Sequence, residues 1–256
     1  MIDPLDRGFT LGDGLFETVL WQEGRLQRLG PHLNRLTAGC EALGLPPPDL
    51  AEAERRMLQA VREAGLASAR AAVRLTLTAG VGGRGLDRPE RPSPTLIATA
   101  ALAPAPTTQA RLVTAAARRN EGSPASRWKT LAYLDNVLAR QEARAAGADE
   151  ALMLNVAGEI ACAAAANIFW VDEDGRLCTP ALDCGVLAGV VRAAVLEAAA
   201  ALGLQALEVR AGREALDGAR HIFVTNSLIG VRGVEALDGR PLAPWDGLAA
   251  LAAAVT

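Results

Sequence analysis

The sequence predicts an α+β fold built from two lobes. Helical patterns come early in the first half of the chain, strand patterns are mixed through the second half, and the Pro104-Ala105-Pro106 segment lies between them. A doubly wound sheet would instead need strands and helices that alternate along the whole chain. We therefore expect a smaller N-terminal α/β lobe over residues 1–108 and a larger C-terminal mixed β/α lobe over residues 109–256.

The first lobe is expected to contain a β-hairpin, two helices and two further strands. A turn around Gly24 joins the arms of the hairpin. Gly44, followed by three prolines, ends the first helix, and Gly65 ends the second. The expected elements are a hairpin over 16–26, helices over 29–43 and 50–64, and strands over 71–78 and 95–101.

The second lobe is expected to combine strands, a hairpin and three helices. The hairpin turns at residues 156–158, and the alanine run 163–166 is a candidate break in its second arm. Alanine-rich stretches near 193–203 and 247–255 are too short or too broken to span a bilayer, so we interpret them as packed helices. The remaining expected elements are strands over 112–116 and 221–225, a hairpin over 150–171, and helices over 134–146 and 190–202.

Composition excludes several classes of partner. A chain of 256 residues with 50% hydrophobic content can build one large core or two modest ones. The net charge of −3 gives no basic field that would hold nucleic acid or an anionic membrane. Aromatic residues make up only 4% of the chain, which also argues against platforms for base stacking.

The cysteines favour a reducing compartment. Cys40, Cys162, Cys178 and Cys184 form no Cys-x-x-Cys pair and no metal-like cluster with the two histidines, so we expect free thiols and no metal site. Residues 1–7 lack the apolar run of a signal peptide. Together these features predict a cytoplasmic protein.

Lys129 lies in the most informative segment of the chain. It is flanked by Trp128 and Tyr133, just before a helical pattern that starts at Leu134. Most of the 26 basic residues are arginine, so solubility alone is a weak reason for a lysine here. Desolvation lowers the pKa of a lysine, and the neutral amine is the form that attacks carbonyls to make Schiff bases. The alternative is an amphipathic lysine whose stem covers apolar surface.

Short strings occur around this lysine in a distinctive order. They are Asp6-Arg7-Gly8-Phe9, Gly12-Asp13-Gly14-Leu15-Phe16-Glu17-Thr18, Gly82-Gly83-Arg84-Gly85, Arg119-Asn120-Glu121, Lys129-Thr130-Leu131, Tyr133-Leu134-Asp135-Asn136, Asp149-Glu150-Ala151-Leu152, Ala166-Asn167-Ile168-Phe169-Trp170 and Thr225-Asn226-Ser227-Leu228. In this order they resemble the class IV (fold type IV) pyridoxal-phosphate-dependent enzymes. That family includes branched-chain aminotransferases, D-amino-acid aminotransferases and 4-amino-4-deoxychorismate lyases, and the chain looks most like the lyases.

The resemblance implies the two-lobed fold type IV aminotransferase-like architecture, pyridoxal 5'-phosphate as the cofactor, and a homodimer. Lys129 would form the Schiff base with the cofactor and later shuttle protons. Tyr133 would hydrogen-bond the phenolic oxygen of the cofactor; the alternative is a packed tyrosine with a satisfied hydroxyl. Arg35 matches the phosphate-binding arginine, whose planar fork donates two bonds to one oxyanion. Its alternative is a surface arginine of a helix.

The resemblance also places the cofactor phosphate at the start of the helix that begins near Val190. Free N–H groups and the helix dipole favour an anion there. Related chains often carry a hydroxyl residue where this chain has Val191, so one side-chain bond is lost while the backbone amides remain. Ser227 lies where the family places another phosphate hydroxyl.

Three residues match substrate-binding positions of the family. Arg84, in a glycine-rich loop that lets it approach a ligand, matches an arginine for a substrate carboxylate. Asn226 fits the pattern of the lyases, and Leu228 is grouped with it. The alternatives are a solvated loop arginine and an asparagine that stabilises a turn.

Cys162 is the main departure from the family. Relatives have a glutamate five residues before the asparagine of the Asn-Ile-Phe string, where it keeps the pyridine nitrogen protonated. A cysteine titrates at about 8.5 and is a weak hydrogen-bond donor, so it replaces the carboxylate only as a stabilised thiolate. Glu159 is three residues away and would lie on the opposite face of the strand. Either the reaction tolerates a neutral pyridine, or the chain has kept the fold and lost the activity.

Three functions follow from these features. The first is a lyase that converts 4-amino-4-deoxychorismate to 4-aminobenzoate and pyruvate, a step of folate synthesis, with Lys129 as the general base. The second is a D-amino-acid or branched-chain aminotransferase of the same fold. The third is a catalytically impaired relative, because Cys162 replaces the usual glutamate. In the first two, the partner is a small-molecule substrate.

Overall fold

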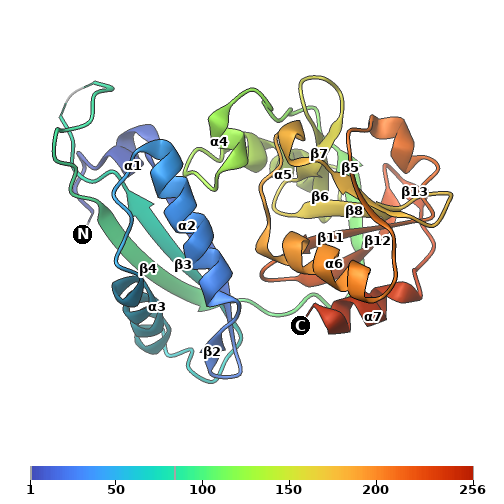
Figure 1. Cartoon of the computed structure of the whole chain (residues 1–256), viewed down its shortest axis with the longest axis horizontal. Helices are drawn as coiled ribbons and strands as arrows, with labels where there is room; N and C mark the ends of the chain where they lie inside the picture. The colour runs from blue at the N-terminus through green and yellow to red at the C-terminus, as the bar shows by residue number, and fades with distance from the viewer. Residues whose placement is uncertain (1, 84, 256) are drawn as a thin grey trace. The chain divides into compact units, whose positions relative to one another are not determined.

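Two units are distinguished by internal packing in the computed structural model, which describes residues 2–83 and 85–255 (Figure 1). The first unit runs to Ala105 and includes Trp128–Ala132. The second contains Pro106–Arg127 and the chain from Tyr133 onward. We expected Lys129 in the second lobe. The structure packs its segment with the first unit, because this segment pairs with a strand of that unit.

The first unit is a four-stranded antiparallel sheet with helices. The strand order is β2-β1-β3-β4, and the hairpin between β1 and β2 turns at Glu23 and Gly24, which both have positive φ. Positive φ at both central residues is the requirement of a type I′ turn. The elements are α1 (Arg7–Leu11), β1 (Gly14–Gln22), β2 (Arg25–Leu26), α2 (Leu29–Leu43), α3 (Leu50–Glu63), β3 (Ala71–Thr78) and β4 (Thr95–Leu102).

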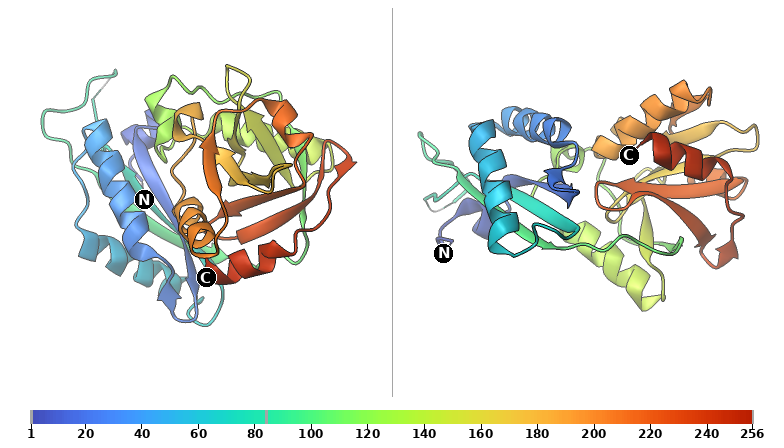
Figure 2. Two further views of the ribbon diagram at one scale, coloured as in Figure 1. Left: turned by 45° about the vertical axis from the view of Figure 1, so that its right-hand side comes forward. Right: turned by 90° about the horizontal axis from the view of Figure 1, so that it is seen from below.

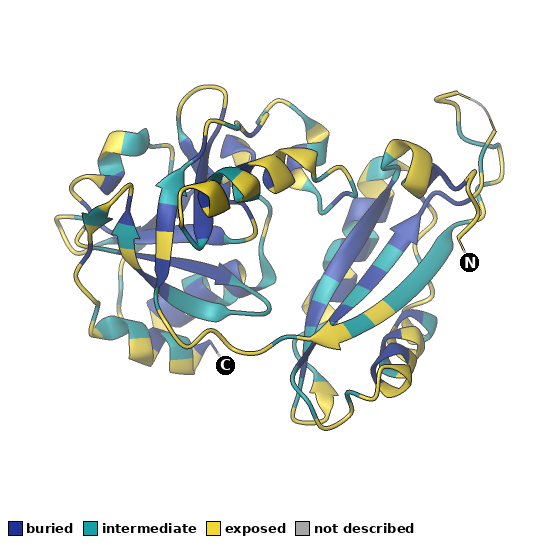
Figure 3. Ribbon diagram, turned by 180° about the vertical axis from the view of Figure 1, so that it is seen from behind, coloured by how far each residue is buried: buried dark blue, intermediate teal, exposed yellow. Residues whose placement is uncertain are grey.

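Strand β1 divides its side chains between the two faces of this sheet. Leu15, Val19 and Trp21 join the core that α2 and α3 cover, whereas Phe16 belongs to the alternate set of side chains. Strands β1 and β3 are largely buried, and β4 is more exposed along the edge of the sheet (Figure 3). The burial of β1 on both faces matters for the site, because the residues that approach Lys129 and Arg35 come from this strand.

The second unit contains a nine-stranded mixed sheet. Its order is β10-β9-β8-β11-β12-β5-β6-β7, and β13 pairs with β12. The strands are β5 (Ala110–Thr114), β6 (Glu150–Leu154), β7 (Ile160–Ala163), β8 (Asn167–Val171), β9 (Leu177–Pro180), β10 (Ala206–Val209), β11 (His221–Asn226), β12 (Gly230–Leu237) and β13 (Arg240–Pro241). The helices are α4 (Pro124–Arg127), α5 (Leu134–Ala145), α6 (Val190–Ala201) and α7 (Gly247–Ala254), with 3₁₀ turns at Leu182–Cys184 and Arg213–Leu216.

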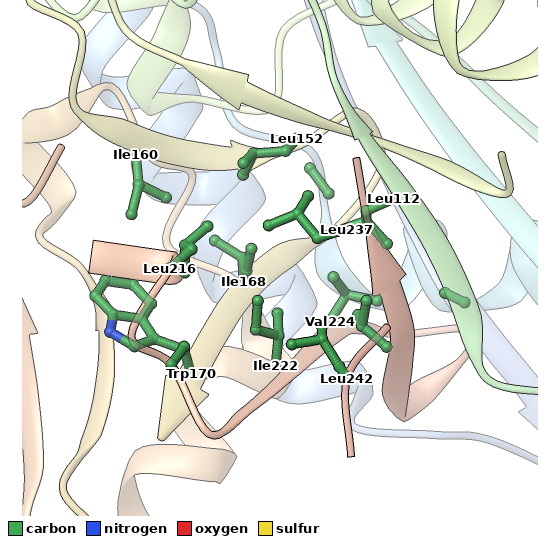
Figure 4. Close-up of a cluster of buried hydrophobic side chains, with 14 of the residues drawn as sticks. Leu112, Leu152, Ile160, Ile168, Trp170, Leu216, Ile222, Val224, Leu237 and Leu242 are labelled. Atoms are coloured by element: carbon green, nitrogen blue, oxygen red, sulfur yellow. The ribbon is translucent and has the colours of Figure 1, made fainter. Parts of the chain in front are cut away.

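One apolar cluster joins most strands of this sheet (Figure 4). Leu112, Leu152, Ile168, Ile222 and Leu237 come from five different strands and converge there. The other side of the sheet carries two further clusters. One is formed with α5, and the other with α6 and α7, which lie side by side (Figure 2).

The predicted α+β class is confirmed, and the break in the alanine run separates β7 from β8. Six further elements were not predicted from the sequence: helices α1 and α4 and strands β9, β10, β12 and β13. In the described part of the chain, no helix combines the length and the apolar character needed to cross a membrane.

Leu152 provides a test of the central cluster, because its side chain is fully buried. Replacement by alanine leaves a cavity, and Leu152→Ala is expected to lower the free energy of unfolding by about 2–5 kcal/mol. Urea unfolding followed by circular dichroism measures this loss. Leu202→Ala is the matched control, since Leu202 is 46% exposed. Equal losses in the two variants would contradict the assigned core.

Candidate active site

Lys129 is held by backbone pairing with the edge of β1. The N–H of Phe16 donates to the carbonyl of Lys129 at 2.9 Å, and the N–H of Leu131 donates to the carbonyl of Gly14 at 3.0 Å. Leu15 and Thr130 form the antiparallel bridge between them. A Cβ at residue 14 would lie 2.4 Å from the carbonyl oxygen of Leu77, so only glycine fits there. Lys129 is therefore held at a fixed position beside the buried strand β1.

The side chain of Lys129 lies over an aromatic ring. Its Nζ is 4.3 Å from the centroid of the Phe16 ring, within the range of a cation–π contact, and Cζ of Arg74 is 3.6 Å from the same centroid. Lys129 is half-buried, and its neighbour Trp128 packs against the core of the first unit. It is also the only lysine among the 26 basic residues of the chain. Because of these contacts, the amine of Lys129 has less rotational freedom than the amine of a solvated lysine.

Arg35 is part of a buried ionic cluster on α2 and β1. Its Nε and Nη2 donate to the two carboxylate oxygens of Glu17 at 2.8 and 2.6 Å. Nδ1 of His32 lies 2.7 Å from Oε2 of Glu17. Such a bidentate pair fixes the guanidinium plane. The structure thus pairs Arg35 with Glu17, a residue of one of the motif strings for which the sequence predicted no role.

Glu17 stays ionised although it is almost fully buried. Burial opposes its charge, but the hydrogen bonds from His32 and Arg35 outweigh that cost and lower the pKa of the carboxyl from 4.5 to about 2. Removal of this charge would leave Arg35 and His32 buried without their common partner.

Tyr133 lies at the N-terminal boundary of α5 and is half-buried. It starts the part of the second unit that follows the lysine segment. Its role toward the phenolic oxygen of the cofactor stays a prediction.

At the N-terminus of α6, the side chain of Asn167 packs closely against the backbone of Gly189. The N-cap is Gly189, which has no side chain to accept hydrogen bonds from the first N–H groups of the helix. A Cβ at residue 189 would lie 2.0 Å from Oδ1 of Asn167, and Nδ2 of Asn167 donates to the carbonyl of Leu187 at 2.9 Å. Asn167 therefore holds the loop in front of the helix. Val190 is half-buried, and Val191 is buried in the cluster beneath α6. Both side chains are apolar, so neither provides a hydrogen bond to a ligand.

Asn226 organises the turn that contains Ser227 and Leu228. Its Oδ1 accepts hydrogen bonds from the N–H groups of Leu228 and Ile229 at 2.8 and 2.9 Å, and its Nδ2 donates to the carbonyl of Ala165 at 2.9 Å. The structure thus gives Asn226 the turn role that was its alternative. Its role toward a substrate stays a prediction, as do those of Ser227 and Leu228, which are both half-buried.

Cys162 is a buried neutral thiol. Burial raises its pKa to about 11; the charge of Arg119 acts in the opposite direction, and the charge of Glu150 acts in the same direction. A stabilised thiolate, one of the ways in which this residue could replace a carboxylate, is therefore disfavoured. Glu159 is no substitute, because its carboxylate is held by Asn155 and Arg210.

Arg119 and Asn136 form a buried junction that the sequence analysis missed. Arg119 donates to Oδ1 of Asn136 at 3.1 Å and to the carbonyls of Ser126 and Gly185. Asn136 in turn donates to the carbonyl of Ala164 at 2.8 Å. The junction ties α5 to the segment that follows Cys162. Both residues belong to the motif strings, and that was the available signal.

Arg84, the predicted ligand of a substrate carboxylate, lies outside the described residues. The loop that follows it is anchored by Arg7, which is 3% exposed. Arg7 donates to the carbonyls of residues 85, 86 and 87 and pairs with Asp13 at 2.9 Å. Arg7, Asp13, Asp87 and Arg88 line an open pocket of about 570 Å³.

Comparison with known proteins identifies the family. Residues 14–237 match the family described as "Amino-transferase class IV", so the chain belongs to the class IV aminotransferase family. Its members use pyridoxal 5'-phosphate. The residues present fit this cofactor: the chain has a single restrained lysine, and the first N–H groups of α6, a helix of 12 residues, favour an anion.

Three similar proteins carry two different activities in their names. A Methanocaldococcus jannaschii protein, provisionally named a branched-chain-amino-acid aminotransferase, is 31% identical over 93% of this chain and 83% of its own. The aminodeoxychorismate lyase of Bacillus subtilis is 30% identical over 90% of this chain and 79% of its own. The crystal structure of a Legionella pneumophila protein, provisionally named a 4-amino-4-deoxychorismate lyase, has a TM-score of 0.90 at 26% identity and covers 98% of this chain and 92% of that one. The fold and cofactor class are therefore shown, and the reaction is left open.

Glu17 gives the ionic cluster a distinct pH signature. Its folded pKa lies below the unfolded value, so its contribution is present above about pH 4.5 and is lost as the pH falls toward 2. The shift corresponds to about 3 kcal/mol. Glu17→Gln is therefore expected to be less stable than the native chain by about this amount at pH 6, and by less at pH 3.

Urea unfolding at the two pH values measures this difference. Glu41→Gln, on the exposed face of α2, makes the same chemical change and is the matched control. The assignment fails if the Glu17 and Glu41 variants show the same dependence on pH.

Proposed function

We propose that the chain is a pyridoxal-phosphate-dependent lyase that converts 4-amino-4-deoxychorismate to 4-aminobenzoate and pyruvate. The proposal is supported by the order of its motifs and by its similarity to the lyase of Bacillus subtilis along most of both chains. The observation that favours the lyase over a transaminase is the neutral thiol of Cys162.

The bound cofactor supplies an electron sink, which is weaker when its pyridine nitrogen carries no proton. Cys162, at the position where relatives place a glutamate, provides no negative charge to keep that proton. In the lyase reaction the product ring becomes aromatic, and the free energy released by aromatisation drives the cleavage. A transaminase reaction releases no such free energy, so it depends more strongly on the cofactor as an electron sink. The neutral thiol is therefore better suited to the lyase.

Lys129 has two roles in this proposal. Its amine attaches the cofactor, and its Nζ then takes the proton from the ring carbon that bears the amino group of the substrate. The bond between the ring and the ether oxygen breaks, and the three-carbon fragment leaves and is protonated to pyruvate. The two products together contain all the atoms of the substrate, so the reaction needs no water and no keto acid. The pairing of Lys129 with β1 orients the amine for both steps.

The remaining site residues are proposed for binding. The N–H groups at Val190 and Val191, together with Ser227, hold the phosphate, and Arg35 adds a positive charge whose plane Glu17 fixes. Tyr133 hydrogen-bonds the phenolic oxygen. Arg84, Asn226 and Leu228 are proposed to contact the substrate.

We also propose that the chain forms a homodimer. Large apolar side chains are exposed on and around α1, with Phe9 at 74% and Leu86 at 82%. Leu5, Leu11 and Val81 are exposed as well. Exposed apolar residues in this number favour a protein interface.

A branched-chain or D-amino-acid aminotransferase is the second candidate. Its support is the Methanocaldococcus jannaschii relative, which is slightly more similar to this chain than the lyase of Bacillus subtilis. A transaminase needs an amino donor and a keto acid acceptor, whereas the lyase needs neither. The acceptor therefore separates the two candidates.

The assay supplies 4-amino-4-deoxychorismate without any keto acid and follows pyruvate with lactate dehydrogenase. The native chain is expected to release pyruvate, and Lys129→Ala to lose about 10²–10⁴-fold, because the general base is gone. Arg127→Ala, an exposed neighbour, is the control and is expected to retain activity. Amine transfer that occurs only with a branched-chain keto acid would support the second candidate. Turnover of neither substrate class would support a catalytically impaired relative.

Cys162→Ser tests whether the thiol contributes charge. Serine is also neutral at ordinary pH, so the variant is expected to change pyruvate release little. Cys178→Ser, another buried thiol in a separate cluster, controls for the cost of burying a hydroxyl, and thermal unfolding of both variants measures that cost. A loss as large as that of Lys129→Ala, without unfolding, would show that a thiolate at position 162 takes part.

A further inference from the structure

The ring of Phe16 is in contact with two cationic side chains. The Nζ of Lys129 lies 4.3 Å from the ring centroid, and the Cζ of Arg74 lies 3.6 Å from it. Lys129 runs along one edge of β1, where its carbonyl accepts from the N–H of Phe16, and Arg74 belongs to β3, which pairs with the other edge. Two positive groups therefore approach one ring from the two neighbours of β1.

Arg74 and Phe16 lie on the same face of the sheet. Arg74 is the register partner of Thr18, which follows Phe16 by two residues, and residues two apart on a strand share a face. Glu17, between them on β1, points to the opposite face, where its carboxylate is held by Arg35 of α2. The negative charge of Glu17 is thus balanced away from the ring.

Within the described strands β1, β3 and β4, no carboxylate lies on the face that carries Arg74. Two carboxylates precede β1, and both have partners of their own. Asp6 accepts from threonine hydroxyls of β3 and β4, and Asp13 pairs with Arg7 and Arg88. Residues 128–132 contain no charged side chain besides the lysine, and the titratable Tyr133 follows them in the second unit.

The two contacts of the Lys129 amine act on its protonation in opposite directions. A positive charge nearby disfavours the ammonium form, because protonation would place two like charges close together. The π-face of the Phe16 ring favours the ammonium form, because its quadrupole attracts a cation. Only the neutral amine attacks an aldehyde to form a Schiff base, and a neighbouring cation is one way to activate a lysine.

We propose that Arg74 favours the neutral, nucleophilic form of the Lys129 amine, while the ring of Phe16 holds that amine in place. Arg74 acts through its charge on Lys129, so it is a positioning residue and forms no bond in the reaction. This inference rests on the proposed Schiff-base role of Lys129. It adds a residue that prepares the amine before the cofactor binds.

The test is an NMR titration of apoprotein that contains ¹³C-labelled lysine. Because Lys129 is the only lysine, its Hε–Cε signal is unique and reports the pKa of its amine. Arg74→Gln is expected to raise this pKa by about one pH unit, and Arg74→Glu to raise it further. Phe16→Leu is expected to lower it by about 0.5–1 pH unit, because the ammonium loses its cation–π contact.

Arg70→Gln is the matched control, because it removes the same charge just before the same strand. Thr76 pairs with Phe16, and Arg70 is six residues away from Thr76, about 20 Å along the strand. The guanidinium of Arg70 also donates to Gln22, at the far end of β1. Charges this far apart are screened at 0.15 M salt, so the pKa of Lys129 is expected to stay unchanged. Thermal unfolding of each apoprotein checks that the variants are folded.

The rate of Schiff-base formation with pyridoxal phosphate provides a second readout. At pH 7, Arg74→Gln is expected to react about tenfold more slowly, because a rise of one pH unit in the pKa leaves about tenfold less neutral amine. The difference is expected to shrink as the pH rises, since both amines then lose their proton. A structural defect would persist at every pH.

An unchanged or lowered pKa of Lys129 in Arg74→Gln would overturn the proposal. An equal rise in Arg70→Gln would overturn it as well, because the effect would then belong to the net charge of the protein. A rise in Phe16→Leu would contradict the assigned ring contact. The titration uses apoprotein without substrate, so its result does not depend on the reaction, and failure of the lyase proposal remains distinguishable from failure of this one.

Discussion

Two backbone hydrogen bonds to strand β1 fix the only lysine of the chain, and the proposed chemistry depends on them. They join Lys129 and Leu131 to Phe16 and Gly14. Because the first residues of β1 are buried, its edge is a rigid support for the segment, which belongs to the first unit through this pairing and through the packing of Trp128. The amine is thus positioned by the main chain, and the ring of Phe16 restricts the rotation of its side chain.

The two units provide positive charge at the proposed binding residues in different ways. In the first unit, Glu17 balances Arg35 inside the protein, so the guanidinium is oriented before any ligand binds. In the second unit, α6 presents backbone N–H groups at a glycine, without a charged side chain at its cap. Cys162 adds no charge, since burial keeps its thiol protonated.

Much of the fold could be predicted from periodicity and turn residues. The helix at Leu29–Leu43 and the strand at Ala71–Thr78 matched in both bounds, because glycine or strong alternation limits them. Strands β9 and β10 were missed because each has four residues, too few for a pattern, and their parallel pairing is decided by tertiary contacts. Among site residues, Lys129 was recognisable by its neighbours. The role of Glu17 was not, because its pairing with Arg35 inside the protein is a property of the packed structure.

Reduction with borohydride tests the central claim most directly, since it makes the bond between cofactor and lysine permanent. Trypsin cleaves after Arg127, Lys129 and Arg140 in the unmodified chain, and a pyridoxyl group on Lys129 blocks the middle cut. Mass spectrometry of the reduced holoenzyme should therefore find residues 128–140 as one modified peptide. Recovery of an unmodified peptide 130–140, with the label absent or on the N-terminal amine, would contradict the account.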